Sequence, residues 1–76
     1  MQRSARDRAV KRAFGRRLKA ARDLRKLTQR DLAKKSGLGP TYIHLLEKGV
    51  RNPSLLALLG LARALRVNLK DLTGHP

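Results

Sequence analysis

The 76-residue chain is long enough for one small domain, and its 41% hydrophobic residues limit the core that it can bury. It contains no cysteine, which excludes disulfides, thiolate zinc sites and cysteine nucleophiles. Nineteen Lys and Arg against five Asp and Glu give a net charge of +14. Such a charge favours a polyanionic partner such as DNA or RNA, with a lipid headgroup surface as the alternative.

Residues 1–13 are polar and basic, and they form either a mobile arm or extra turns of the first helix. Apolar residues then recur in steps of three and four, which predicts an amphipathic helix that ends near Lys26. The expected buried face of this helix comprises Val10, Phe14, Leu18, Ala21 and Leu24.

The second helix is predicted from Gln29 to about Lys35, because Thr28 is a good N-cap and Asp31 suits the third helical position. It buries Leu32 and Ala33, and Gly37 takes the left-handed conformation that ends it.

The third helix is predicted at residues 40–48, with Pro40 at its first position and Gly49 at its end. Ser54 caps a fourth helix at 55–65, and Asn68 caps a short fifth helix through Leu72. Residues 73–76 are expected to be a frayed tail.

Two short helices joined by a glycine-containing turn predict a helix-turn-helix at residues 29–48 of an all-α domain that spans residues 14–72. The small Ala33 lets the two helices approach, and Gly37 provides the turn conformation. Counted from Gln29, the key positions are Ala33 fifth, Gly37 ninth, Ile43 fifteenth and Leu46 eighteenth.

The stretch from Phe14 to Leu72 resembles the Cro/phage-repressor (XRE-type) helix-turn-helix family. The resemblance rests on RLKAAR at 17–22, LTQRDLAKKSGL at 27–38, TYIHLLEKG at 41–49 and NPSLLALLGLARAL at 52–65. Within the family, the chain looks most like the compact controller proteins of restriction–modification systems. An antitoxin or a phage-type repressor of the same fold is the alternative.

The resemblance implies a compact five-helix domain and a prokaryotic regulator of transcription that binds double-stranded DNA sequence-specifically. Helix 40–48 would lie in the major groove, with Thr41 facing base edges and Gln29 beside the phosphate backbone. Pro40 and Leu45 depart from the polar residues often found there, so readout relies on Thr41, thymine methyls and DNA shape. The expected DNA-binding residues are Gln29, Thr41, Tyr42, His44, Leu45, Lys48, Arg51 and Asn52.

Four of the side chains in and beside the third helix have structural interpretations as well. Tyr42 either places its hydroxyl on a phosphate or packs in the core. His44 has no acidic or histidine partner at ligand spacing, so we expect a surface residue rather than a metal ligand. Arg22 and Glu47 match a pair that bridges the first and third helices in relatives, and we expect an ion pair that does not read DNA.

The fourth helix contains more leucine than one core-facing stripe requires. Leu56 and Leu59 fall on the side away from the core, which predicts a homodimer surface; tolerated exposed leucines are the alternative. Leu69 and Leu72 on the fifth helix are the next candidates for this surface. The expected core stripe is Leu55, Leu58, Leu61, Ala62 and Leu65.

Other functional classes fit the sequence less well. An RNA-binding or ribosome-associated protein would fit the charge, but only Phe14 and Tyr42 are aromatic, which leaves no stacking platform. A membrane-surface helix at residues 3–25 would not explain residues 28–65. Five acids, two histidines and no cysteine offer no catalytic or metal-binding constellation, so we expect neither an enzyme nor a cofactor. Without a secretory signal or a membrane span, we expect a cytoplasmic, nucleoid-associated protein.

Overall fold

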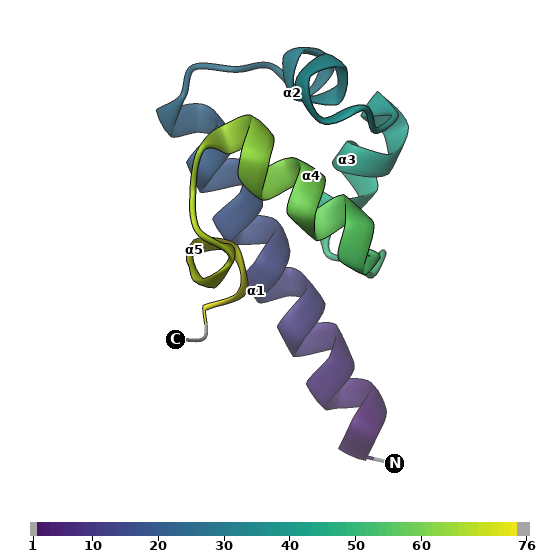
Figure 1. Ribbon diagram of the computed structural model, residues 1–76. Coiled ribbons are helices and arrows are strands. Elements are labelled where there is room, and N and C mark those ends of the chain that lie inside the picture. The colour runs from purple at the N-terminus through teal and green to yellow at the C-terminus, as the bar shows by residue number, and fades with distance from the viewer. Residues whose placement is uncertain (1, 75–76) are drawn as a thin grey trace.

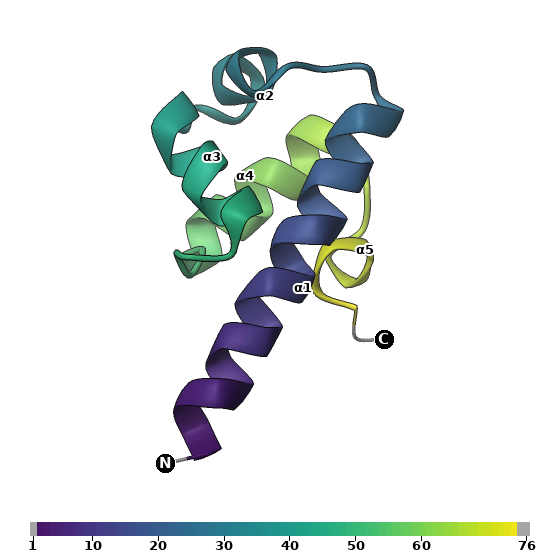
Figure 2. The ribbon, with the colours of Figure 1, turned by 180° about the vertical axis from the view of Figure 1, so that it is seen from behind.

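The structure is a computed structural model that describes residues 2–74, and it includes the side chains of residues 5–74. The described residues form helices and no strands, which confirms the all-α fold class. In chain order the helices are α1 (Gln2–Leu24), α2 (Gln29–Ser36), α3 (Pro40–Lys48), α4 (Leu55–Leu65) and α5 (Leu69–Thr73). Helix α1 packs against α3 and α5, and α2 and α4 complete the bundle by packing against these two helices and against each other. The N-terminal half of α1 projects beyond the other helices (Figures 1 and 2).

Helix α1 is 23 residues long and continues through the segment that the sequence left open between an arm and a helix. The central part of its expected apolar face is buried, with Phe14 5% exposed and Leu18 fully buried. Its two ends are not buried, since Val10 is 58% and Leu24 81% exposed. Both residues were expected in the core, and both lie where α1 extends past the helices that cover it.

The ends of α2 and α3 follow the predicted capping chemistry. The Thr28 hydroxyl accepts a hydrogen bond from the Asp31 backbone N–H, and the Asp31 carboxylate accepts one from the Thr28 backbone N–H, both at 2.9 Å. The hydrogen bond from the Thr28 backbone N–H lowers the pKa of Asp31, so the carboxylate remains charged beside the positive end of α2. Gly37 and Gly49 close the two helices in the left-handed conformation, with φ of 78° and 79°.

Helix α4 turns the expected face to the core except at Leu55 in its first turn, and Leu58 packs against the core as expected. Leu55 was assigned to the core stripe but is 68% exposed, whereas Ala57 is buried. Leu61, Ala62 and Leu65 are buried as expected. The first turn of α4 therefore contributes only Ala57 to the core and exposes Leu55 and Leu56 to solvent.

Helix α5 extends one residue beyond the expected end. Thr73 belongs to the helix, and Gly74 caps it with a hydrogen bond from its N–H to the Lys70 carbonyl oxygen, although both were expected in a frayed tail. Residues 75–76 lie outside the described residues. Leu72 is fully buried in the core, so it does not contribute to an exposed dimer surface as the sequence suggested.

Gly15 sets how closely α1 and α3 approach. A Cβ atom at this position would lie 2.5 Å from the carbonyl oxygen of Glu47 and 2.6 Å from that of Leu46. These are backbone atoms of α3 and cannot rotate away, so only glycine allows the two helices to pack at this distance.

Gly15→Ala should therefore lower the free energy of unfolding by roughly 1–3 kcal/mol, the usual cost of overpacking, although alanine is the better helix former. Thermal and urea denaturation measure the effect. Gly60→Ala is the matched control, because it also lies within a helix but its added Cβ would meet only the Ser36 carbonyl oxygen at 3.3 Å. We expect a smaller change for the control. Unchanged or raised stability of Gly15→Ala would contradict the close approach of α1 and α3.

Candidate nucleic-acid interface

Helix α3 has one buried face and one exposed face. Ile43 and Leu46 are fully buried beneath it, as predicted. Of the residues expected to contact DNA, Thr41, His44 and Lys48 are exposed and Leu45 is half-buried. At 100° per residue these four fall within about 100° of one another on the side opposite the core. The exposed face is therefore continuous along the helix.

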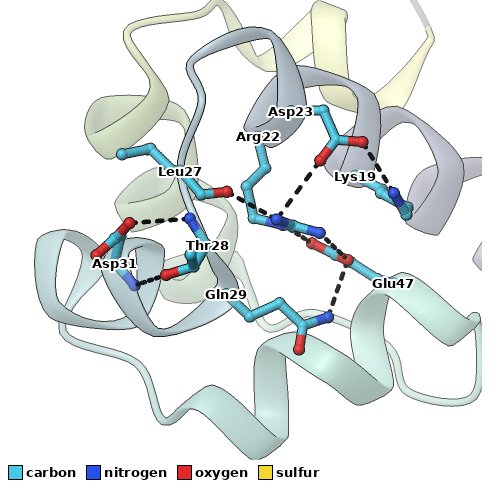
Figure 3. Close-up of polar contacts among 8 residues, drawn as sticks. All are labelled: Lys19, Arg22, Asp23, Leu27, Thr28, Gln29, Asp31 and Glu47. Carbon is cyan, nitrogen blue, oxygen red and sulfur yellow. Dashed lines mark hydrogen bonds and ion pairs between the residues drawn. The ribbon is translucent and has the colours of Figure 1, made fainter.

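Glu47 on one flank of α3 joins this helix to α1 (Figure 3). The Arg22 Nε donates to Glu47 Oε2 at 2.6 Å, and Nη2 donates to Oε1 at 3.0 Å. Nη1 donates to the Leu27 carbonyl oxygen at 2.7 Å, so Arg22 also holds the loop before α2. The two charged side chains are only 11% and 5% exposed, so removing either would leave a nearly buried charge without its partner. The ion pair expected from the sequence is present.

Gln29 begins α2 and reaches across to the same carboxylate. Its Nε2 donates to Glu47 Oε1 at 3.0 Å, and the residue is half-buried (Figure 3). An amide nitrogen carries two hydrogens, and the second has no acceptor among the described residues. Gln29 is thus held in place by one N–H and presents the other at the positive end of α2.

These contacts control the charge beside the exposed face of α3. Glu47 is the one acid in the α3 sequence PTYIHLLEK, and its carboxylate is paired with Arg22. The hydrogen bond with Glu47 raises the pKa of the Arg22 guanidinium above its ordinary value. A hydrogen bond from Lys19 at 2.8 Å lowers the pKa of Asp23, which keeps this carboxylate charged and paired. The carboxylates near α3 are therefore matched by cations, and an approaching polyanion meets no uncompensated acid there.

Tyr42 lies on the other flank of α3, toward α4. The sequence left open whether it contacts phosphate or packs in the core. Its ring is half-buried and packs against the core, while its hydroxyl accepts a hydrogen bond from the Ser54 backbone N–H at 3.3 Å. The Arg51 guanidinium lies 5.6 Å from the ring centre. Tyr42 therefore organises the loop after α3, in which Arg51 and Asn52 are exposed.

Sequence reasoning missed the hydrogen bond between Gln29 and Glu47. The two residues are 18 positions apart and lie on different helices, so no periodic pattern links them. Because the sequence left residues 1–13 open between an arm and a helix, it also did not place their basic residues on one helix face, although Arg8, Arg12 and Arg16 are spaced in steps of four.

No metal site emerges from the part of the chain that the structure describes, because no three His, Asp or Glu residues gather there. None of the described helices is both long and apolar enough to cross a lipid bilayer.

Residues 18–72 match the helix-turn-helix family. An uncharacterized HTH-type transcriptional regulator of Sinorhizobium fredii is 40% identical over 52 residues, which are 68% of this chain and 26% of that protein. The immunity repressor protein of Bacillus phage phi105 is 42% identical over 61 residues, which are 80% of this chain and 42% of the repressor. The chain thus spans less than half the length of either relative.

A solved structure is similar over nearly its whole length. The restriction-modification controller protein C.AhdI from Aeromonas hydrophila superposes with a TM-score of 0.82 at 41% sequence identity. The alignment covers 84% of this chain and 97% of that chain. Sequence and fold agree, and the chain belongs to the helix-turn-helix family, of the Cro/phage-repressor (XRE-type) kind that its motifs resemble.

Proposed function

We propose that the chain is a transcriptional regulator that binds double-stranded DNA sequence-specifically, as a homodimer, with α3 in the major groove. The observation that carries the proposal is the exposed face of α3 in a protein of net charge +14, beside which the one acid of the helix, Glu47, is neutralised by Arg22. A protein that binds the chromosome in this way works in the cytoplasm, at the nucleoid. None of the relatives and structures named above is described as an enzyme.

The proposed contacts divide into base reading and positioning. Thr41, His44 and the exposed part of Leu45 face the base edges, where Thr41 offers a hydroxyl and Leu45 an apolar surface to thymine methyls. Pro40 donates no hydrogen bond in the first turn, so DNA shape contributes to the choice of site. The positioning residues, which contact the sugar–phosphate backbone, are Gln29, Tyr42, Lys48, Arg51 and Asn52.

An RNA-binding function receives less support from the structure. Single-stranded RNA is recognised largely by stacking bases on exposed aromatic rings. Phe14 and Tyr42 are the two aromatic residues of the sequence, and they are buried and half-buried in the core. The relatives include a phage immunity repressor and a restriction–modification controller, so both kinds of regulator remain candidates for this chain.

Substitutions at the proposed contacts should separate positioning from reading. Gln29→Ala and Arg51→Ala should weaken binding evenly across duplex sequences, because they remove backbone contacts. Thr41→Ala should relax the preference at one or two base positions by roughly 1–3 kcal/mol. Selection from random duplex DNA, followed by equilibrium titration, measures both effects.

Lys70→Ala on α5 is the control for loss of one exposed side chain. An unchanged base preference for Thr41→Ala would remove Thr41 from the base-reading residues. Tighter binding to single-stranded RNA than to any selected duplex would contradict the proposed function.

The proposed homodimer surface is the exposed side of α4. Leu56 is 79% and Leu59 39% exposed, and Leu55 adds to them because it is exposed rather than buried. These residues lie within about 100° of one another on α4, which makes a continuous apolar stripe. Leu69 on α5, 38% exposed, is the next candidate. A two-fold dimer of this kind would read two half-sites about one helical turn apart.

Replacing Leu56 and Leu59 with Glu should give a folded monomer, because two buried charges would oppose association of the stripes. Sedimentation and light scattering measure the mass, and Leu24→Glu is the control at an equally exposed leucine. We expect the double variant to lose specific binding while it retains weak non-specific binding. A double variant that remains a dimer would move the interface elsewhere, and a wild type that is monomeric on its preferred DNA would contradict the two-fold arrangement.

A further inference from the structure

The N-terminal half of α1 is a helical basic extension of the domain. Residues 2–17 precede the part of the chain that matches the family, and they continue α1 as regular helix. In both views this half of α1 projects away from the other helices (Figures 1 and 2). A helix has a fixed pattern of faces, so the direction in which each basic side chain points follows from its position.

Four basic residues form one stripe along α1. At 100° per residue they fall within about 80° of one another, and all four are exposed. Among the described side chains, only the last has an acidic partner, since Lys19 pairs with Asp23. We call these residues the basic stripe: Arg8, Arg12, Arg16 and Lys19.

The basic stripe runs along the side of α1 that faces α3. Gly15 and Arg22, which contact α3, lie at the edge of the stripe on the helical projection. Arg12 lies directly against the end of α3, because a Cβ on Gly49 would be 2.8 Å from the Arg12 Cα. Helix α5 packs on the other side of α1 (Figure 2), where a Cβ on Gly74 would meet the Arg17 guanidinium.

We propose that the basic stripe binds phosphates of the same duplex that receives α3, beyond the C-terminal end of α3. This inference rests on the proposed function, because it takes the exposed face of α3 as the neighbouring contact. Two observations support it. The positive charge of the stripe is complementary to phosphate, and the stripe continues the basic surface that Lys48 and Arg51 form at the end of α3 outward to Arg8. The stripe is about 16 Å long, and each DNA strand carries a phosphate every 3.4 Å of helix axis.

A helical extension binds phosphates differently from a disordered arm. Its backbone is already ordered, so binding does not require the loss of backbone entropy that folding an arm would require. The stripe also extends the contacted DNA in one fixed direction. Its contacts are to phosphates and do not depend on the base sequence. They should therefore raise the affinity for all duplexes and lengthen the stretch of DNA that the protein protects in a footprint.

The test compares two double variants that lose the same charge. Arg8→Gln with Arg12→Gln removes half of the stripe. Arg6→Gln with Lys70→Gln is the matched control, because Arg6 lies about 160° from Arg8 and about 120° from Arg12 around α1, and Lys70 lies on α5. All four positions are exposed, and thermal melting verifies that both variants fold. The measurements are the salt dependence of binding to a selected duplex and hydroxyl-radical footprinting.

We expect the stripe variant to reduce the slope of log affinity against log salt by about two for each bound protomer, at about 0.9 per phosphate contact. Its footprint should lose protection at one edge, with the base preference unchanged. The control should keep the wild-type footprint and most of the slope.

The inference is overturned if the stripe variant matches the control in slope and footprint while Thr41→Ala still alters base preference; the proposed function then stands. It is overturned as well if the stripe variant loses binding to anionic phospholipid vesicles but not to duplex DNA. If the wild type binds no duplex, both the inference and the proposed function fail.

Discussion

The close contact between α1 and α3 is the constraint on which the rest of this domain depends. Gly15 lets the backbone of α3 lie against α1, at a distance that no side chain would allow. Arg22 holds the same part of α3 through the side chain of Glu47. The backbone and the carboxylate of Glu47 are thus both fixed against α1. This fixes the rotation of α3, and with it the direction in which Thr41 and Lys48 point.

The same contact determines the electrostatics of the exposed surface. Glu47 would repel phosphate if it were free, but it accepts hydrogen bonds from Arg22 and Gln29 instead. Gln29 is thereby held with one N–H unused at the start of α2. Because α1 lies so near α3, the basic stripe of α1 continues the exposed side of α3. Packing and charge therefore favour the same partner, a long polyanion that lies across both helices.

Local signals in the sequence predicted the helices and their ends well. The capping residues Thr28, Asp31, Gly37 and Gly49 each form hydrogen bonds with residues only three or four positions away, so the local sequence identifies them. The errors came from contacts between helices. Leu55 and Leu72 were assigned the wrong exposure, because a helical projection shows which residues share a face but not which face is covered. Val10 and Leu24 belong to an apolar face that is longer than the surface covering it. The resemblance to a known family indicated which residues of α3 to consider and also predicted the ion pair between Arg22 and Glu47. The hydrogen bond from Gln29 to Glu47 could be found only in the folded structure.

We propose that α1 and α3 together form one continuous surface for duplex DNA. Mapping the amide chemical shifts of the isotope-labelled chain during titration with a selected duplex tests it most directly. The largest changes should occur at Gln29, in residues 40–52 and along the basic stripe, and they should saturate together. Changes confined to α5 and the exposed side of α4, with residues 40–48 unperturbed, would contradict it.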